Sequence, residues 1–153
     1  LGECHVHKDI NPHTLDRIRH EHPQAEVLVH PECGCAGQLI YAMGQGDIPA
    51  EGVHIASTER MIQLVKERPA NEFIIATETG IMHRMELLAP EKHFFAADRA
   101  AVCAFMKTIT LEATRDALAL DRFHVRVPAD IADRARRSVE RMIAIGTPSA
   151  TGE

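Results

Sequence analysis

Short apolar runs alternate with amphipathic stretches along most of the chain. The runs are rich in β-branched residues, which is typical of buried strands, and we expect strands at 25–29, 53–56, 72–77 and 92–96. The stretches between them place apolar residues three and four positions apart, and we expect helices at 12–20, 36–43, 57–66 and 80–88. Strands that alternate with helices predict an α/β fold, a three-layer αβα unit with a short parallel sheet.

The pattern changes after the last of these strands. Residues 97–108 read as a loop, and Thr110 opens a helix that we expect to reach Leu120. The alternation at 124–127 predicts a strand, and Pro128 starts a last helix to Ile145. We therefore expect an α/β unit at 11–108, a helix-strand-helix segment at 109–146 and a frayed tail at 147–153.

Composition excludes several classes of protein. With 153 residues, 45% apolar and 25% charged, the chain suits about one globular domain. A net charge of −5 with scattered Lys and Arg argues against a nucleic-acid surface. No apolar run approaches the roughly 20 residues of a membrane span, and no signal-peptide pattern opens the sequence. Since four cysteines accompany this pattern, we expect metal or redox chemistry in the cytoplasm. The start at Leu1 leads us to expect a piece of a longer protein.

The segment Val29-His-Pro-Glu-Cys-Gly-Cys35 concentrates the groups that could do chemistry. Pro31 removes a backbone donor and ends the strand before it, so His30 and Glu32 lie at its carboxyl end. Ligands bind at that edge in open α/β sheets. An imidazole and a carboxylate two positions apart could serve as base and acid, although spacing alone leaves this open. Cys33 and Cys35 are too close together for a usual zinc site, and a disulfide between them would be awkward.

Other candidate groups each have a structural alternative. Ser57 and Thr58 stand where a strand gives way to a helix, so they either cap the helix or help to hold an anion there. Cys4 and Cys103 are far apart in sequence and are either ligands or small buried apolar residues. His5 and His7 could join Cys4 at a metal, although alternate residues of a strand point to opposite faces.

Two further features favour structural roles. Thr77-Glu-Thr-Gly80 repeats the strand-to-helix arrangement, with capping and packing the favoured reading, and His83 and Arg84 follow one turn into that helix. Lys107, four positions after Cys103, reads as a solvated side chain.

Several motifs together resemble one known family. They are Gly2-Glu-Cys4-His-Val-His7, Val27-Leu-Val-His-Pro-Glu-Cys33, Ala56-Ser-Thr58-Glu-Arg-Met61, Glu72-Phe-Ile-Ile-Ala-Thr-Glu-Thr-Gly80, Ile81-Met-His-Arg84, Val102-Cys103-Ala-Phe-Met-Lys107 and Ile109-Thr-Leu-Glu112. In this order they resemble the carboxy-terminal portion of the quinolinate synthase family (NadA) of bacterial and plastid NAD biosynthesis. The chain departs from the family with Glu59-Arg60 after Thr58 and with an insertion at about 44–51.

The resemblance implies an architecture and a cofactor. Family members have three similar α/β units around a central site, so residues 1–10 would end the second unit and 11–108 would form the third. They bind a [4Fe–4S] cluster through three cysteines, one per unit, and Cys4 and Cys103 fall on the second and third. One iron stays open and can act as a Lewis acid. The first cysteine would lie outside this chain.

The resemblance also implies an activity in NAD biosynthesis. The family's transferases condense iminosuccinate with dihydroxyacetone phosphate to quinolinate, and L-aspartate oxidase or aspartate dehydrogenase supplies the imine. His30, Pro31 and Glu32 fall on the substrate-binding motif, and Thr58, beside Ser57, falls on the residue that holds a substrate carboxylate. We expect Glu32 to transfer protons and His30 to polarise the substrate, with no nucleic-acid or membrane partner. The 153 residues alone would be inactive. The alternative is a non-catalytic metal-binding or scaffold module in which Cys4 and Cys103 hold a structural ion.

Overall fold

A computed structural model describes residues 4–8 and 10–146. The chain divides into two compact units, Leu1–Thr108 and Ile109–Glu153, and each is described here by itself. The expected tail at 147–153, and residues 1–3 and 9 of the segment assigned to a preceding unit, lie outside the described residues.

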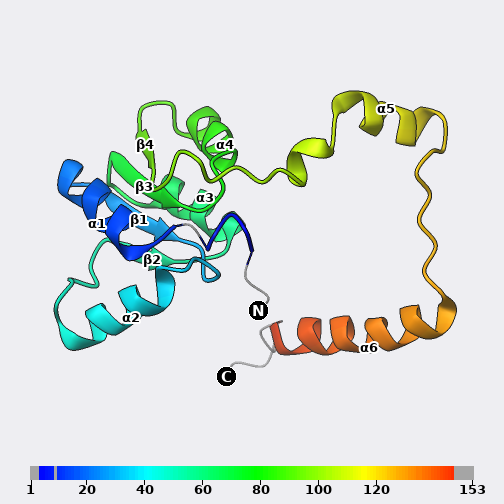
Figure 1. Cartoon of the computed structure of the whole chain (residues 1–153), viewed down its shortest axis with the longest axis horizontal. Helices are drawn as coiled ribbons and strands as arrows, with labels where there is room; N and C mark the ends of the chain where they lie inside the picture. The colour runs from blue at the N-terminus through cyan, green and yellow to red at the C-terminus, as the bar shows by residue number, and fades with distance from the viewer. Residues whose placement is uncertain (1–3, 9, 147–153) are drawn as a thin grey trace, which may run out of the picture. The chain divides into compact units, whose positions relative to one another are not determined.

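The first unit is built on a four-stranded parallel sheet in the order β2-β1-β3-β4 (Figure 1). Its strands are β1 (Glu26–Val29), β2 (Val53–Ile55), β3 (Glu72–Ala76) and β4 (His93–Ala96). The predicted parallel α/β sheet is confirmed, and each strand lies within one or two residues of its expected position. β2 and β3 lie on opposite sides of β1, so the chain reverses its direction of winding between β1 and β3. In open α/β sheets such a switch point leaves a crevice at the carboxyl ends of the strands.

Helices cover both faces of the sheet, which completes the predicted three layers. They are α1 (Pro12–Glu21), α2 (Ala36–Gln45), α3 (Thr58–Glu67) and α4 (Ile81–Leu88). Val27 and Val29 of β1 pack with residues of α1 and α2, whereas Leu28 packs with residues of α3 and α4. Because both faces are covered, the strands read as continuous apolar runs, which is typical of parallel sheets.

Local signals set the ends of these helices. Asn11 caps α1, since its Oδ1 accepts a hydrogen bond from the N–H of Thr14 at 3.1 Å. The expected end of α2 at Met43 is too early, because the helix continues to Gln45. Gly46 ends it with φ of +83°, the left-handed conformation that glycine adopts most easily at a helix end. Residues 44 and 45, beyond the expected end of this helix, are therefore helical.

An ion cluster ties the amino end of the sheet together. Glu26 of β1 is 9% exposed and accepts a hydrogen bond from Nη2 of Arg68 at 2.8 Å. Nε2 of His54, on β2, lies 2.7 Å from the same carboxylate. Burial alone would raise the pKa of Glu26, but the hydrogen bonds with Arg68 and His54 lower it on balance. The carboxylate therefore joins two strands to the end of α3.

The second unit contains α5 (Leu111–Ala119), capped by Thr110, and α6 (Ala129–Gly146). The expected strand at 124–127 is wrong, because no described residue pairs with this segment in a sheet. A strand needs a hydrogen-bonded neighbour, and alternating side chains cannot supply one. Apolar side chains stay exposed here, including Val125 (82%) and Met142 (66%). Among the described helices of both units, none is long and apolar enough to cross a membrane.

Candidate functional site

The candidate site lies at the carboxyl ends of β1 and β3, where the winding reverses. His30 directly follows β1, and its backbone N–H donates to the carbonyl oxygen of Ala76, the last residue of β3, at 3.2 Å. On the other side of β1, the N–H of Ala56 donates to the carbonyl oxygen of Val29 at 2.9 Å. The turn after β1 and the turn that carries Ser57 therefore lie at one edge of the sheet.

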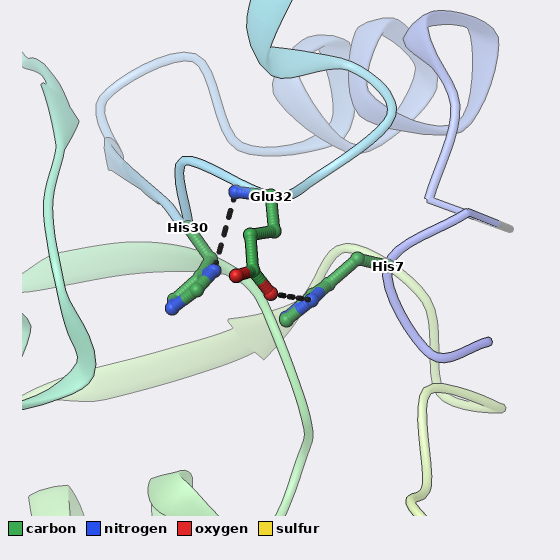
Figure 2. A group of neighbouring side chains, drawn as sticks. All are labelled: His7, His30 and Glu32. Carbon is green, nitrogen blue, oxygen red and sulfur yellow. Dashed lines mark hydrogen bonds and ion pairs between the residues drawn. The ribbon is translucent and has the colours of Figure 1, made fainter. Parts of the chain in front are cut away.

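His7 joins this edge from the start of the chain (Figure 2). Its ring stacks on the ring of His30, with centroids 4.5 Å apart and planes within 5° of parallel. Its Nε2 lies 2.9 Å from Oγ1 of Thr77, the residue after β3, and its Nδ1 lies 3.8 Å from Oε2 of Glu32. The backbone oxygen of His7 also accepts from the N–H of Gly34 at 3.0 Å. The turn after β1 and the residue after β3 thus hold one imidazole between them.

Burial makes the charged form of His7 less favourable. The residue is 8% exposed, and desolvation lowers the pKa of His7, as does the neighbouring His30, while Glu32 acts in the opposite direction. Nδ1 is buried and has no hydrogen-bond partner within the described part of the chain. In a neutral ring, Nε2 either accepts from the Thr77 hydroxyl, with the proton on Nδ1 facing Glu32, or donates its own proton to that hydroxyl.

Glu32 combines a fixed backbone with an exposed carboxylate. Its N–H donates to Nδ1 of His30 at 3.3 Å, which leaves Nε2 of that ring to carry the proton in the neutral form. The Glu32 side chain is 68% exposed, so a substrate could reach it. One ligand atom from each of His7, His30 and Glu32 lies within 4.8 Å of the others. Such a group can move protons between neighbouring atoms, and its donor types could also bind a divalent metal ion.

Ser57 and Thr58 form the start of α3. Oγ of Ser57 accepts from the N–H of Arg60 at 3.4 Å, so the capping role is present. Thr58, the first helical residue, is exposed. The two charged residues of the departure are engaged in ion pairs: Glu59 with Arg84 at 3.0 Å and Arg60 with Glu67 at 2.9 Å. The Arg60 side chain therefore lies along α3, and the Glu59 side chain points toward α4.

Cys4 and Cys103 lie in two loops that contact each other. The carbonyl oxygen of Cys4 accepts from the N–H groups of His7 and Lys8 in a tight turn, at 3.0 Å each. His5 and Phe105, close in sequence to the two cysteines, have ring centroids 5.3 Å apart. Both residues are half-buried. Within the described residues neither cysteine belongs to a group of three possible metal ligands, so a cluster site would need a ligand from elsewhere.

Cys33 and Cys35 belong to the core. They are 5% and 1% exposed, and Sγ of Cys33 donates to the carbonyl oxygen of Ile10 at 3.5 Å. Hydrogen bonding with Cys33 and burial raise the pKa of the Cys35 thiol. A buried thiol that stays protonated is a poor nucleophile, which disfavours a thiol-redox role.

The sequence indicates for His7 only a possible role as a metal ligand beside Cys4, and for Thr77 it favours capping or packing. The two residues are 70 positions apart, and the fold brings them together because the backbone of His7 is bonded to Gly34 in the turn after β1, while β1 pairs with β3, which Thr77 follows. The sequence does place Thr77 directly after a strand, at the edge where ligands bind, and both residues belong to the motifs of the family resemblance, but neither signal indicates that the two side chains meet.

Comparisons with known proteins identify the family. The model of the family described as quinolinate synthetase A protein (NadA) matches residues 1–144. The chain is 45% identical over 145 residues to a quinolinate synthase of Thermus thermophilus, covering 95% of this chain and 44% of that protein. It is 44% identical over 147 residues to a quinolinate synthase of Mycobacterium tuberculosis, covering 96% of this chain and 42% of that protein. The chain therefore spans less than half the length of these relatives, and it belongs to the NadA (quinolinate synthetase A) family.

Proposed function

We propose that the full-length protein that contains this chain is a quinolinate synthase. It would condense iminosuccinate with dihydroxyacetone phosphate, releasing phosphate and two waters to give quinolinate. The family match over residues 1–144 carries this proposal. The cluster of His7, His30 and Glu32 supports it, because imine formation and dehydration both require placed acids and bases.

The geometry suggests a role for each predicted site residue. Glu32 would transfer protons, since its carboxylate is exposed and lies beside two imidazoles. His30, held at Nδ1, would present Nε2 to a substrate oxygen and polarise it. Pro31 fixes the turn that carries both side chains. Thr58, with Ser57 and the amino end of α3, would hold a substrate carboxylate.

A [4Fe–4S] cluster would be the cofactor, with Cys4 and Cys103 as two of its three protein ligands. Two thiols on adjoining loops fit such a cluster, because cysteine thiolates are its usual ligands. When bound, the cluster would supply an iron with an open position, a Lewis acid for substrate oxygens. The third cysteine would come from the part of the protein outside this chain.

The proposed reaction also defines a cellular setting. Iminosuccinate is an unstable imine, so an enzyme that makes it from aspartate, such as L-aspartate oxidase or aspartate dehydrogenase, would act just before this protein. We place this chemistry in the cytoplasm as part of NAD biosynthesis. These assignments follow from the proposed activity.

Replacing Glu32 with glutamine in the full-length protein tests the proposal. Glutamine keeps the size and the hydrogen-bonding capacity of the side chain but cannot transfer a proton. We expect quinolinate formation to fall about 100-fold, with the absorbance of the cluster unchanged. The matched control is Glu86→Gln, at an exposed carboxylate of α4, which should keep wild-type activity. Wild-type turnover by Glu32→Gln would remove Glu32 from the mechanism. A full-length protein that binds the cluster but makes no quinolinate would support the non-catalytic alternative.

A further inference from the structure

The turn from Thr77 to Gly80 connects the histidine site to the loop of Cys103. Thr77 holds His7 at one end of this turn. Two residues later, the N–H of Thr79 donates to the carbonyl oxygen of Ala101 at 2.9 Å. Between them stands Glu78, a carboxylate for which the proposed function has no role.

The Glu78 side chain is 13% exposed and makes three polar contacts. Its Oε1 accepts from the backbone N–H of Cys103 at 3.3 Å, and its Oε2 accepts from the N–H of Gly80 at 2.7 Å. Nζ of Lys107 lies 3.5 Å from Oε1. The sequence predicted a solvated lysine at this position, and the side chain is indeed 55% exposed, but it is paired with Glu78.

Glu78 and Lys107 together hold the backbone of Cys103, one at its N–H group and the other at its carbonyl oxygen. Glu78 accepts from its N–H, and the backbone N–H of Lys107 donates to its carbonyl oxygen at 3.1 Å. Sγ accepts from the N–H of Met106 at 3.5 Å. The position of the thiol is therefore coupled to one carboxylate and one short turn.

Gly80 leaves room for this arrangement. A Cβ at this position would lie 2.7 Å from Oε2 of Glu78 and 3.0 Å from Nζ of Lys107. The backbone of Gly80 has φ of −62°, which any residue adopts, so the constraint is space. Without a side chain at Gly80, the carboxylate and the ammonium group can both lie against the turn.

We propose that Glu78 is a positioning residue for Cys103 and that Glu78 and Lys107 together set the charge beside the cluster that Cys103 would bind. The inference rests on the proposed function, which makes Cys103 a ligand. Groups that hold a metal ligand in place affect metal affinity, and charges and hydrogen bonds near an iron–sulfur cluster set its reduction potential. The Glu78 carboxylate, bonded to the backbone of Cys103, makes it harder to add an electron to the cluster. The positive charge of Lys107 offsets this effect.

The test uses the full-length protein, reconstituted anaerobically with iron and sulfide. The variants are Glu78→Ala, Glu78→Gln and Lys107→Met, with Glu86→Gln as the control. For each, iron loss to a chelator is timed, and the midpoint potential is measured by a titration followed by EPR.

We expect Glu78→Ala to lose iron about 10-fold faster or more, and Glu78→Gln to retain iron almost as well as the wild type because it keeps an acceptor for Cys103. Removing the negative charge in Glu78→Gln should shift the midpoint potential upward, whereas Lys107→Met should shift it downward. A role limited to capping α4 predicts no such opposite shifts.

Potentials that stay unchanged, or that shift in the same direction in both charge variants, would overturn the inference. If Glu78→Ala does not fold, the potentials of Glu78→Gln and Lys107→Met decide it. A separate variant, Cys103→Ser, tests the assumption that Cys103 is a cluster ligand. Full iron content in that variant would show that Cys103 is not a ligand and would overturn this inference as well. Loss of iron from Cys103→Ser, with Glu78 and Lys107 variants like the wild type, would overturn the inference about Glu78 alone.

Discussion

Replacing Thr77 with valine tests whether His7 belongs to the active site. Valine has nearly the same shape, so the change removes little except the hydroxyl that lies 2.9 Å from Nε2 of His7. Thr77 is 2% exposed and His7 8%, so water has little access to replace the lost partner. Leaving a buried polar group unpaired costs about 1–3 kcal/mol. If His7 must keep this orientation for catalysis, the same free energy is lost from the transition state, which corresponds to a fall of about 5- to 150-fold in kcat/KM.

The assay is the rate of quinolinate formation by the full-length protein at several substrate concentrations. Thr79→Val is the matched control, because the hydrogen bond of Thr79 to Ala101 uses its backbone N–H and survives the change. Wild-type kcat/KM in Thr77→Val would refute the reasoning, since the ring would then not need Thr77 to be placed for catalysis. A loss of equal size in both variants would also refute it, because it would indicate a general disturbance of the turn.

Two further predictions concern other parts of the first unit. Thr58→Ala should raise the half-saturating concentration of iminosuccinate roughly 5- to 30-fold through a lost hydrogen bond of about 1–2 kcal/mol, and an unchanged value would leave Thr58 with only a structural role. Because the pKa of Glu26 is lowered in the fold, its stabilising contribution is fully present above the ordinary carboxyl pKa and is lost as the pH falls through the lower value. Glu26→Gln should therefore flatten the acid side of a plot of unfolding midpoint against pH, and an acid side as steep as that of the wild type would contradict this prediction.

The first unit could be predicted because each of its elements carries its own signal. Strands buried on both faces read as short apolar runs, and each helix has a periodic apolar side and an identifiable start or end. The sequence predicts too early an end for α2 because turn residues are dense from Gly44 to Pro49, whereas the helix stops only at the left-handed Gly46. The alternation at 124–127 also met the sequence criterion for a strand. Pairing depends on a neighbouring strand, and the described residues supply none.

The site was predictable only where it is local in sequence. His30 and Glu32 share one turn after one strand, so their proximity follows from the chain itself. The contact of His7 with Thr77 depends on the pairing of β1 with β3, which the spacing of residues does not reveal. The same holds for Glu78, which reaches the backbone of Cys103, 25 positions further along the chain.

The most direct test of the account is anaerobic reconstitution of the full-length protein, followed by counts of iron and sulfide, an EPR spectrum and assay of quinolinate from iminosuccinate and dihydroxyacetone phosphate. The account predicts about four irons and four sulfides per chain, as a [4Fe–4S] cluster requires, together with quinolinate formation. It also predicts that Cys4→Ser and Cys103→Ser lose both the cluster and the activity. A full-length protein that makes quinolinate equally well with both cysteines replaced, or that forms a cluster and no quinolinate, would contradict it.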